Sequence, residues 1–170
     1  MTINVIVCTD SDQGIGRDGR IPWECKEDLR YFKEKTCGTG RNAVVMGRRT
    51  YDSLPRGMLP GRHNFVISRS LDRASDLESS LLTFSSRIED VLAKEEQFDE
   101  MWIIGGATIY NYVLSKYPHL VKEIHITELN ASFSCDTFWK DSDAFTNIYS
   151  QQQLSPDAVA RVFVRNSKDY

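Results

Sequence analysis

The feature that most constrains the fold of this chain is a series of short apolar runs, several rich in β-branched residues and each bounded by turn residues. Strands of a parallel sheet that helices cover on both faces are apolar throughout and lack simple alternation. Each run is therefore expected to be such a strand. The runs are INVIVCT (3–9), AVVMG (43–47), NFVIS (64–68), LLTFS (81–85), MWIIG (101–105) and EIHITEL (123–129).

Helical patterns lie between these runs, and strand alternating with helix predicts an α/β domain with right-handed crossovers. The last forty residues differ, because segments 145–153 and 158–166 flank the turn sequence Leu154–Ser155–Pro156–Asp157 and predict an antiparallel hairpin. We expect one domain, residues 1–170, with a mixed, mostly parallel twisted sheet of about eight strands and about four helices. The helical segments are 25–36, 48–54, 87–96 and 107–116.

Length and charge limit the classes of function. A chain of 170 residues suits a single domain, and its net charge of −3 gives no general attraction to nucleic acid or anionic membrane. No apolar run approaches the ~20 residues of a membrane span, and the N-terminus lacks the basic region of a secretory signal. The four cysteines form no C-x-x-C pair and have no histidines at metal-ligand spacing. We therefore expect a reducing, cytoplasmic setting, no metal and no disulfide frame.

The stretch GIGRDG, residues 14–19, matches the G-x-G-x-x-G pattern of dinucleotide-binding folds. In that pattern the third glycine lies inside a helix that holds the pyrophosphate. Here Pro22 follows Gly19 closely, and proline excludes a helix that runs from Gly14 through this point. The segment is therefore expected to be a loop of some dozen residues, and the match does not indicate a phosphate site.

The helix expected next carries an acid on its apolar stripe. Asp28 and Phe32 are four residues apart and share a face with Leu29 and Thr36. Two interpretations of Asp28 remain open. It is either a first-turn acid that favours the helix dipole, or a half-buried anion that awaits a cationic or N–H-rich ligand.

Three segments that follow strands carry features of phosphate sites. MGRRT (46–50) and IIGGATIY (103–110) each join a strand to a helix start through glycine, and Ser68–Arg69–Ser70 adds a third basic element. Helix N-terminal amides and arginines bind phosphate esters. Glycine at a strand-to-helix turn also has a simple packing role, so each segment alone permits both interpretations.

The chain resembles the dihydrofolate reductase family over nearly its whole length, and the order and spacing of the matching blocks are those of the family. The blocks are GIGRDGRIPW, EDLRYFK, VVMGRRTYDSLP, LPGRHNFVIS, MWIIGGATIY, IHITEL, CDTF and RVFVRNSKDY. The resemblance implies reduction of 7,8-dihydrofolate to tetrahydrofolate, with hydride transfer from NADPH to pterin C6 and protonation of N5. It implies dihydrofolate and antifolate-type small molecules as ligands, and we expect a monomer.

The resemblance also assigns residues. Asp28 is the implied acid of the pterin pocket, Thr127 is linked to it, and Trp23 helps to order a water near the site. Arg62 binds the α-carboxylate of the folate tail, and Cys8 lies near the pterin, where the family commonly has alanine. The remaining substrate-binding residues are Val7, Leu29, Phe32, Leu54, Ile104 and Tyr110.

The segment from Gly14 to about Glu24 matches the family's mobile lid. The implied NADPH-binding residues are Ile15, Gly16, Ile21, Gly47, Arg48, Arg49, Thr50, Ser68, Arg69, Gly105, Gly106, Ala107, Thr108 and Ile109. Arginine near the ribose has independent support, because a 2′-phosphate requires a cation whereas a bare ribose favours an acid. Cys135 departs from the usual glycine or serine, which weakens the expectation that its loop couples to the lid. Lys140 replaces a frequent proline.

The proton donor to N5 stays open between water and Asp28 itself. Two rival functions are another pyridine-nucleotide reductase of the same fold, such as the pyrimidine reductase of riboflavin synthesis, and a non-catalytic NADPH-binding module. The acid-and-Phe helix together with LPGR (59–62) favours folate over the first rival. The presence of both Asp28 and Trp23 argues against the second.

Overall fold

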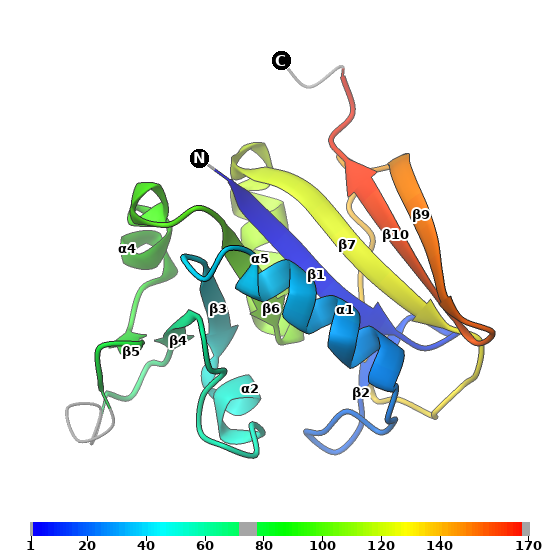
Figure 1. Ribbon diagram of the computed structural model, residues 1–170, viewed down its shortest axis with the longest axis horizontal. Helices are drawn as coiled ribbons and strands as arrows, with labels where there is room; N and C mark the ends of the chain where they lie inside the picture. The colour runs from blue at the N-terminus through cyan, green and yellow to red at the C-terminus, as the bar shows by residue number, and fades with distance from the viewer. Residues whose placement is uncertain (1, 72–77, 168–170) are drawn as a thin grey trace.

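The computed structural model describes residues 2–71 and 78–167. Within these residues, eight strands form one twisted sheet in the order β5-β4-β3-β6-β1-β7-β10-β9 (Figure 1). The α/β architecture with a mostly parallel sheet and a C-terminal hairpin is confirmed. The strands are β1 Ile3–Thr9, β3 Ala43–Gly47, β4 His63–Ile67, β5 Leu82–Ser85, β6 Met101–Gly105, β7 Val121–Leu129, β9 Asn147–Ser155 and β10 Ala158–Val164.

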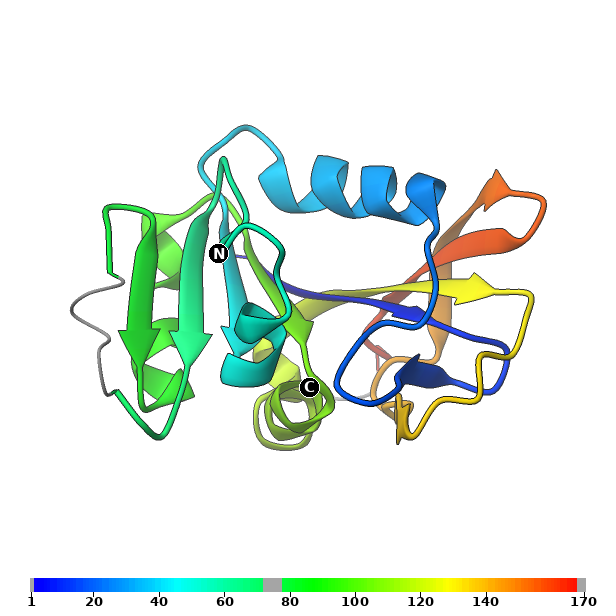
Figure 2. The same cartoon turned by 90° about the horizontal axis from the view of Figure 1, so that it is seen from below.

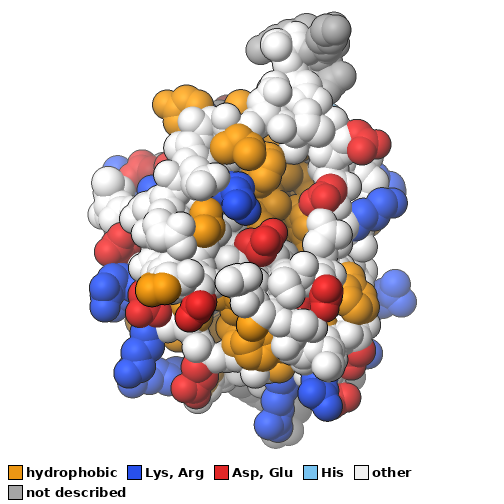
Figure 3. All heavy atoms as spheres, turned by 90° about the vertical axis from the view of Figure 1, so that its right-hand side faces the viewer, with side chains coloured by type: hydrophobic (Ala, Val, Ile, Leu, Met, Phe, Trp, Pro, Cys, Tyr) orange, Lys and Arg blue, Asp and Glu red, His pale blue; other side chains and the backbone are white. Residues whose placement is uncertain are grey.

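The six strands from β5 to β7 are parallel, so their carboxyl ends meet at one edge of the sheet. Strand β10 pairs antiparallel with β7, and β9 pairs antiparallel with β10. Strand β9 is therefore an edge strand. Its Ile148 and Tyr149 are exposed, and hydrophobic side chains are visible on the side of the molecule that carries this hairpin (Figure 3).

Helices cover both faces of the sheet, as Figure 2 shows. On one face α1 and α2 contribute Tyr31 and Tyr51 to a core around Val44, Val66 and Trp102. On the other face α4 and α5 pack on a second core. Burial on both faces explains why the central strands are apolar throughout. The described α-helices are α1 Lys26–Cys37, α2 Arg48–Asp52, α4 Ile88–Leu92 and α5 Ala107–Lys116.

Three details differ from the expected elements. The segment 87–96 is a short helix, α4, followed by a 3₁₀ turn at Glu95–Gln97 rather than one continuous helix. Strand β9 extends to Ser155, so the hairpin turn is only Pro156–Asp157. The expected lid loop contains a strand, β2 Gly14–Gly16, which pairs with β8 Thr137–Phe138 in a separate two-stranded sheet. The last three residues of the block RVFVRNSKDY lie outside the described residues.

The connections of neighbouring strands diverge at the carboxyl edge of the sheet. Strand β1 leads to α1 on one face, whereas its neighbour β6 leads to α5 on the opposite face. The other neighbour of β6, β3, leads to α2 on the α1 face. Ligands of open α/β sheets bind where adjacent strands send their connections to opposite sides. The ends of β1, β6 and β3 therefore define the candidate site.

Candidate functional site

Two glycines bring backbone close together where β6 and β3 end. Gly105 has φ +112°, and a Cβ added there would lie 3.0 Å from the ring of Tyr110. A Cβ on Gly47 would lie 3.2 Å from Ile109. The Gly105–Gly106 peptide bond is cis. A side chain at either position would press on α5, so glycine allows the backbone of both turns to lie close to the start of that helix.

The start of α5 fits an anion. Neither α5 nor α2 has an acidic residue in its first turn, and neither start has a side-chain cap. The amides at Gly106 to Ile109 are thus available to a negatively charged group. Arg48, Arg49 and Thr50 follow Gly47 immediately, and Thr50 Oγ1 would lie 3.7 Å from a Cβ on Gly106. The two expected phosphate segments are therefore adjacent in space.

The arginines of this region differ in their contacts and in their exposure to solvent. The Arg48 Nε donates to Asp52 Oδ1 at 3.0 Å, and its guanidinium lies over the rings of Tyr51 and Phe84. Arg49 and Arg69 are exposed. Ser68 is buried at the end of β4. A basic, solvent-facing surface thus borders the carboxyl ends of β3 and β4.

Asp28 lies in the first turn of α1, above the ends of β1 and β7. Burial raises the pKa of its carboxyl, and hydrogen bonding from the Thr127 and Cys8 side chains partly opposes that shift. Of the two interpretations of Asp28, the structure supports the half-buried anion. No cationic side chain is among the groups that shift its pKa.

The stripe of α1 that faces the sheet differs from the expected one. Tyr31 and Thr36 are the buried residues of the helix, whereas Leu29 is 62% exposed. Tyr31 lies three residues after Asp28 and so shares its face. Its hydroxyl hydrogen-bonds His125 Nδ1 at 2.7 Å. Leu29 is therefore free of the core and open to contact with a ligand, rather than a member of the buried stripe.

A row of polar side chains lies beneath α1, and the sequence patterns did not indicate it. His125 Nε2 contacts Glu123 Oε2 at 2.9 Å. Burial, followed by the charges of Glu123 and Asp28, raises the pKa of Tyr31 to about 12. The Tyr31 hydroxyl therefore stays protonated and ties α1 to β7. Histidine at an alternating position of an apolar strand is the only sequence signal for this contact.

Arg62 is buried, with 3% of its surface exposed, and lies beside α1. Its Nε donates to the Pro60 carbonyl at 3.0 Å, and its Nη1 donates to Thr36 Oγ1 at 2.9 Å. The guanidinium centre lies 6.0 Å from the ring of Phe32. The protein thus fixes one side of a planar cation and leaves the other donors for a carboxylate. Leu54 is half-buried and packs against the same core as Phe32.

The remaining predicted substrate residues lie at the ends of β1, β6 and α5. Val7 is buried in the core on the α5 face, while Ile104 packs on the α1 face. Tyr110 is buried, and its hydroxyl donates to the Ile6 carbonyl at 2.7 Å. Tyr110 therefore braces the turn at Gly105 from within the core.

The predicted lid is tied to the loop that precedes β8. Gly14 and Gly16 pair with Phe138 and Thr137, and the Asp18 amide donates to Asp136 Oδ2 at 2.9 Å. The lid and this loop are therefore coupled, and Cys135 does not prevent the coupling as the sequence had suggested. A Cβ on Gly14 would lie 2.4 Å from that of Cys135, so the glycine accommodates the larger residue.

Other lid residues are placed as follows. Ile15 packs against the core on the α5 face, whereas Ile21 is exposed. The Trp23 ring lies 5.3 Å from Phe133. Among the described residues no helix begins before Lys26, so the prediction that no helix runs from Gly14 through Pro22 is confirmed.

Asp10 organises the start of the lid, a role that the sequence patterns did not indicate. Its carboxylate accepts backbone hydrogen bonds from Asp12, Gly14 and Phe133 at 2.7 to 3.0 Å. Burial opposes the charged form, but these hydrogen bonds lower the pKa of Asp10 overall. Aspartate that binds backbone amides two residues onward is the usual signal of such a turn.

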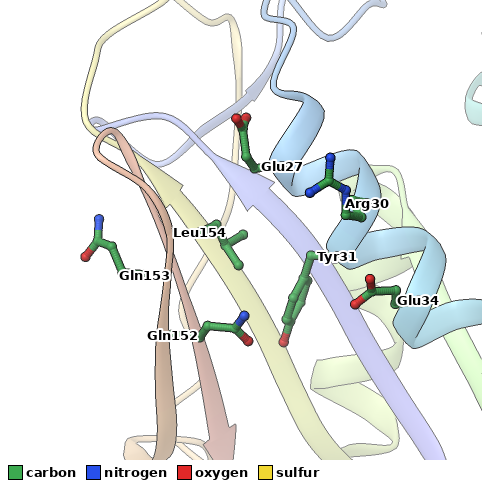
Figure 4. A pocket seen from close by; sticks show the side chains of 7 residues that line it. All are labelled: Glu27, Arg30, Tyr31, Glu34, Gln152, Gln153 and Leu154. Atoms are coloured by element: carbon green, nitrogen blue, oxygen red, sulfur yellow. The ribbon is translucent and has the colours of Figure 1, made fainter.

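A separate hollow of about 150 Å³ lies between α1 and β9 (Figure 4). Glu27, Arg30 and Glu34 line it from the helix, and Gln152 lines it from the hairpin. It shares only Tyr31 with the polar row beneath α1.

Among the described residues, no group of three His, Cys, Asp or Glu side chains is arranged to bind a metal ion. None of the described helices is long and apolar enough to cross a membrane.

Comparison with known proteins gives concordant matches. The sequence profile of the family described as dihydrofolate reductase matches residues 2–165. The dihydrofolate reductase of Saccharomyces cerevisiae is 31% identical over 163 residues, covering 88% of this chain and 77% of that protein. The dihydrofolate reductase of Mycobacterium leprae is 44% identical over 117 residues, covering 67% of each chain.

Longer relatives match as well. The bifunctional dihydrofolate reductase-thymidylate synthase 2 of Arabidopsis thaliana is 38% identical over 148 residues, which are 81% of this chain but 26% of that protein. Among solved structures, a dihydrofolate reductase from Enterococcus faecalis complexed with NADP(H) and RAB-propyl has a TM-score of 0.80. Its identity is 23%, and the match covers 97% of this chain and 96% of that one, so it supports the fold.

Proposed function

We propose, because this chain belongs to the dihydrofolate reductase family, that it reduces 7,8-dihydrofolate to 5,6,7,8-tetrahydrofolate with NADPH. The observation that carries the proposal is a half-buried carboxylate, Asp28, in the first turn of α1, at the edge of the sheet where the connections of adjacent strands diverge. When bound, NADPH supplies the hydride that reaches pterin C6. The protein supplies binding, orientation and electrostatics.

The crevice fits this cofactor. The uncapped start of α5 and the close backbone approach at Gly105 and Gly106 suit a pyrophosphate. Exposed Arg49 and Arg69, with Ser68, suit a 2′-phosphate and so favour NADPH over NADH. Ile15, Gly16 and Ile21 of the lid would contact the nicotinamide half. The residues proposed to hold the pyrophosphate and adjacent ribose are Gly47, Arg48, Thr50, Gly105, Gly106, Ala107, Thr108 and Ile109.

Asp28 is proposed as the anchor of the pterin ring. An ionised carboxylate that keeps free lone pairs accepts hydrogen bonds from the N3 and 2-amino groups of the ring. Its negative charge also favours the cationic pterin that forms when N5 gains a proton. Hydrogen bonding from Thr127 favours the charged form of the carboxyl. Water near Trp23 is the proposed immediate proton donor.

The rest of the cleft is proposed to select a folate. Phe32, Leu54 and the exposed Leu29 offer apolar contact to the two aromatic portions, and Val7 and Ile104 lie at the pterin edge. Arg62 would bind the α-carboxylate with the donors that its Pro60 and Thr36 contacts leave free. A pyrimidine reductase would instead need a ribose phosphate held at this position.

We also propose a monomer in the cytoplasm. The four cysteines are free thiols, which fits a reducing compartment. The chain spans about a quarter of the Arabidopsis relative, and the proposed activity concerns the described domain alone.

The proposed function is tested by following the absorbance of NADPH with purified protein. Oxidation of NADPH that requires dihydrofolate and is blocked by an antifolate is the expected result. The same assay with the pyrimidine substrate of riboflavin synthesis in place of dihydrofolate serves as the comparison. Turnover of that substrate alone, or binding of NADPH without any dihydrofolate-dependent oxidation, would contradict the proposal.

A further inference from the structure

Helix α1, which carries Asp28, has few side chains buried against the sheet. Tyr31 and Thr36 are the buried residues among its twelve. Both are held by side-chain hydrogen bonds, because the Tyr31 hydroxyl binds His125 of β7 and Thr36 accepts from Arg62. Hydrogen bonds are directional, whereas apolar contacts are not. These two contacts therefore fix the position of α1 along the sheet more closely than apolar packing does.

His125 lies on the face of β7 that α1 covers. Ile124 and Ile126 pack in the core on the α5 face. Side chains alternate along a strand, so His125 and Thr127 project toward α1. The imidazole is 4% exposed, and its ring centroid lies 4.9 Å from that of Trp102, which belongs to the core on the α1 face. The ring is therefore enclosed between the sheet and the helix.

Two partners assign the proton of the His125 ring. Its Nε2 lies 2.9 Å from Glu123 Oε2, and its Nδ1 lies 2.7 Å from the Tyr31 hydroxyl oxygen. A carboxylate only accepts, so Nε2 carries the proton and Nδ1 accepts from Tyr31. Burial lowers the pKa of His125, and the hydrogen bond to Glu123 opposes that shift without reversing it. The neutral ring thus satisfies Tyr31 and Glu123 at the same time.

Both ends of the contact between Tyr31 and His125 are close in sequence to residues of the candidate site. Tyr31 follows Asp28 by three residues on α1, and its side chain extends from the helix toward the strands (Figure 4). His125 precedes Thr127 by two residues on β7. Each pair shares one face of its element. A shift of α1 that lengthens the contact would therefore also move Asp28 relative to Thr127.

We propose that His125 is a positioning residue for the reduction, which holds α1 through Tyr31 in the place where Asp28 and Phe32 meet the pterin. This inference rests on the proposed function. Glu123 selects the tautomer that accepts from Tyr31, so the three polar side chains act as one unit. The unit acts on dihydrofolate and not on NADPH, because α1 carries none of the residues proposed to hold the cofactor.

The direct test of the contact is the ¹⁵N NMR spectrum of the His125 imidazole, assigned by comparison with His125→Phe. At pH 7 the Nε2 nitrogen should carry a proton and Nδ1 should not. Tyr31→Phe should shift the Nδ1 resonance, because that nitrogen loses its donor. A proton on Nδ1, or an Nδ1 resonance that Tyr31→Phe leaves in place, would overturn the inference whether or not the protein reduces dihydrofolate.

The functional test is a double-mutant cycle of Tyr31→Phe and His125→Phe, followed by the Kd values for dihydrofolate and for NADPH. Loss of one hydrogen bond is expected to raise the Kd for dihydrofolate about threefold to tenfold in Tyr31→Phe, while the Kd for NADPH stays at the wild-type value. The double variant should bind dihydrofolate no more weakly than the weaker single variant, because the two side chains act together. Additive effects of the two substitutions would contradict the proposed unit.

Tyr117→Phe is the matched control. The Tyr117 hydroxyl donates to Glu89 Oε1 at 3.0 Å, and Tyr117 packs against the core on the α5 face, so the same chemical change is made away from α1. A cooperative thermal transition verifies that each variant is folded. If Tyr31→Phe lowered Tm like Tyr117→Phe but bound dihydrofolate like wild type, the contact would be structural only, and the inference would be overturned. A wild-type protein that neither binds nor reduces dihydrofolate would instead refute the proposed function, while the NMR spectrum would still report the contact.

Discussion

Replacement of Gly105 by alanine tests the turn on which the cofactor site depends. Gly105 has φ +112°, a backbone conformation that residues with a side chain rarely adopt. An added Cβ would lie 3.0 Å from Cε2 and 3.1 Å from Cζ and Oη of Tyr110. The ring cannot retreat freely, because the Tyr110 hydroxyl donates to the Ile6 carbonyl at 2.7 Å. The substitution therefore combines backbone strain with overpacking.

The expected cost follows from these two effects. A residue held at such a φ costs about 1–3 kcal/mol, and overpacking of a filled core adds about 1–3 kcal/mol. A total of roughly 2–6 kcal/mol is a large share of the ~5–15 kcal/mol stability of a typical domain. At about 2–4 °C per kcal/mol, Tm should fall by roughly 4–24 °C.

Gly40→Ala is the matched control. Gly40 has φ +89°, but no heavy atom lies within 4 Å of its added Cβ, so only the backbone strain remains. Thermal unfolding of both variants separates the two contributions, and titration with NADPH reports the effect on the cofactor site. If Gly105→Ala lost no more stability than Gly40→Ala and bound NADPH like wild type, the tight turn would not have the role assigned to it.

Three further substitutions probe the cleft. Arg62→Ala should raise KM for dihydrofolate tenfold or more while kcat changes little, because a tail contact contributes equally to ground and transition states; an unchanged KM would reject the tail assignment. Arg69→Ala should reduce the ratio of kcat/KM for NADPH to that for NADH about tenfold or more, and an unchanged ratio would exclude this arginine from 2′-phosphate recognition. Asp28→Asn should raise Tm at pH 7. The folded-state pKa of Asp28 lies above its unfolded value, so its favourable contribution is present in acid and lost as pH rises through the folded pKa. Equal Tm values of variant and wild type at pH 7 would contradict the burial of a charged group.

The sheet and most helix limits were predictable from the sequence, because burial on both faces makes a parallel strand apolar throughout. The helix at 107–116 agrees with α5, whereas the segment 87–96 was predicted too long. Its buried apolar residues, Ile88, Val91 and Leu92, extend over only about one and a half helical turns. The polar sequence that follows has no core-facing residue to continue the helix.

The placement of side chains in the candidate site was less predictable. Periodicity placed Asp28 on the inner face of α1, but it did not distinguish buried Tyr31 from exposed Leu29. The buried Tyr31 hydrogen-bonds His125 of β7, which lies far along the chain. The pairing of Gly14 with Phe138 likewise joins segments that no local pattern connects. Contacts between distant segments require the topology as well as the sequence.

The dependence of kcat/KM on pH for wild type and Asp28→Asn tests the central claim most directly. If the buried carboxylate anchors and stabilises the reacting pterin, the variant should be slower by roughly 10²-fold or more near neutral pH. It should recover part of the loss in acid, where solvent protonates the substrate beforehand. Turnover of dihydrofolate by Asp28→Asn at the wild-type rate at pH 7 would remove Asp28 from the mechanism and contradict the account.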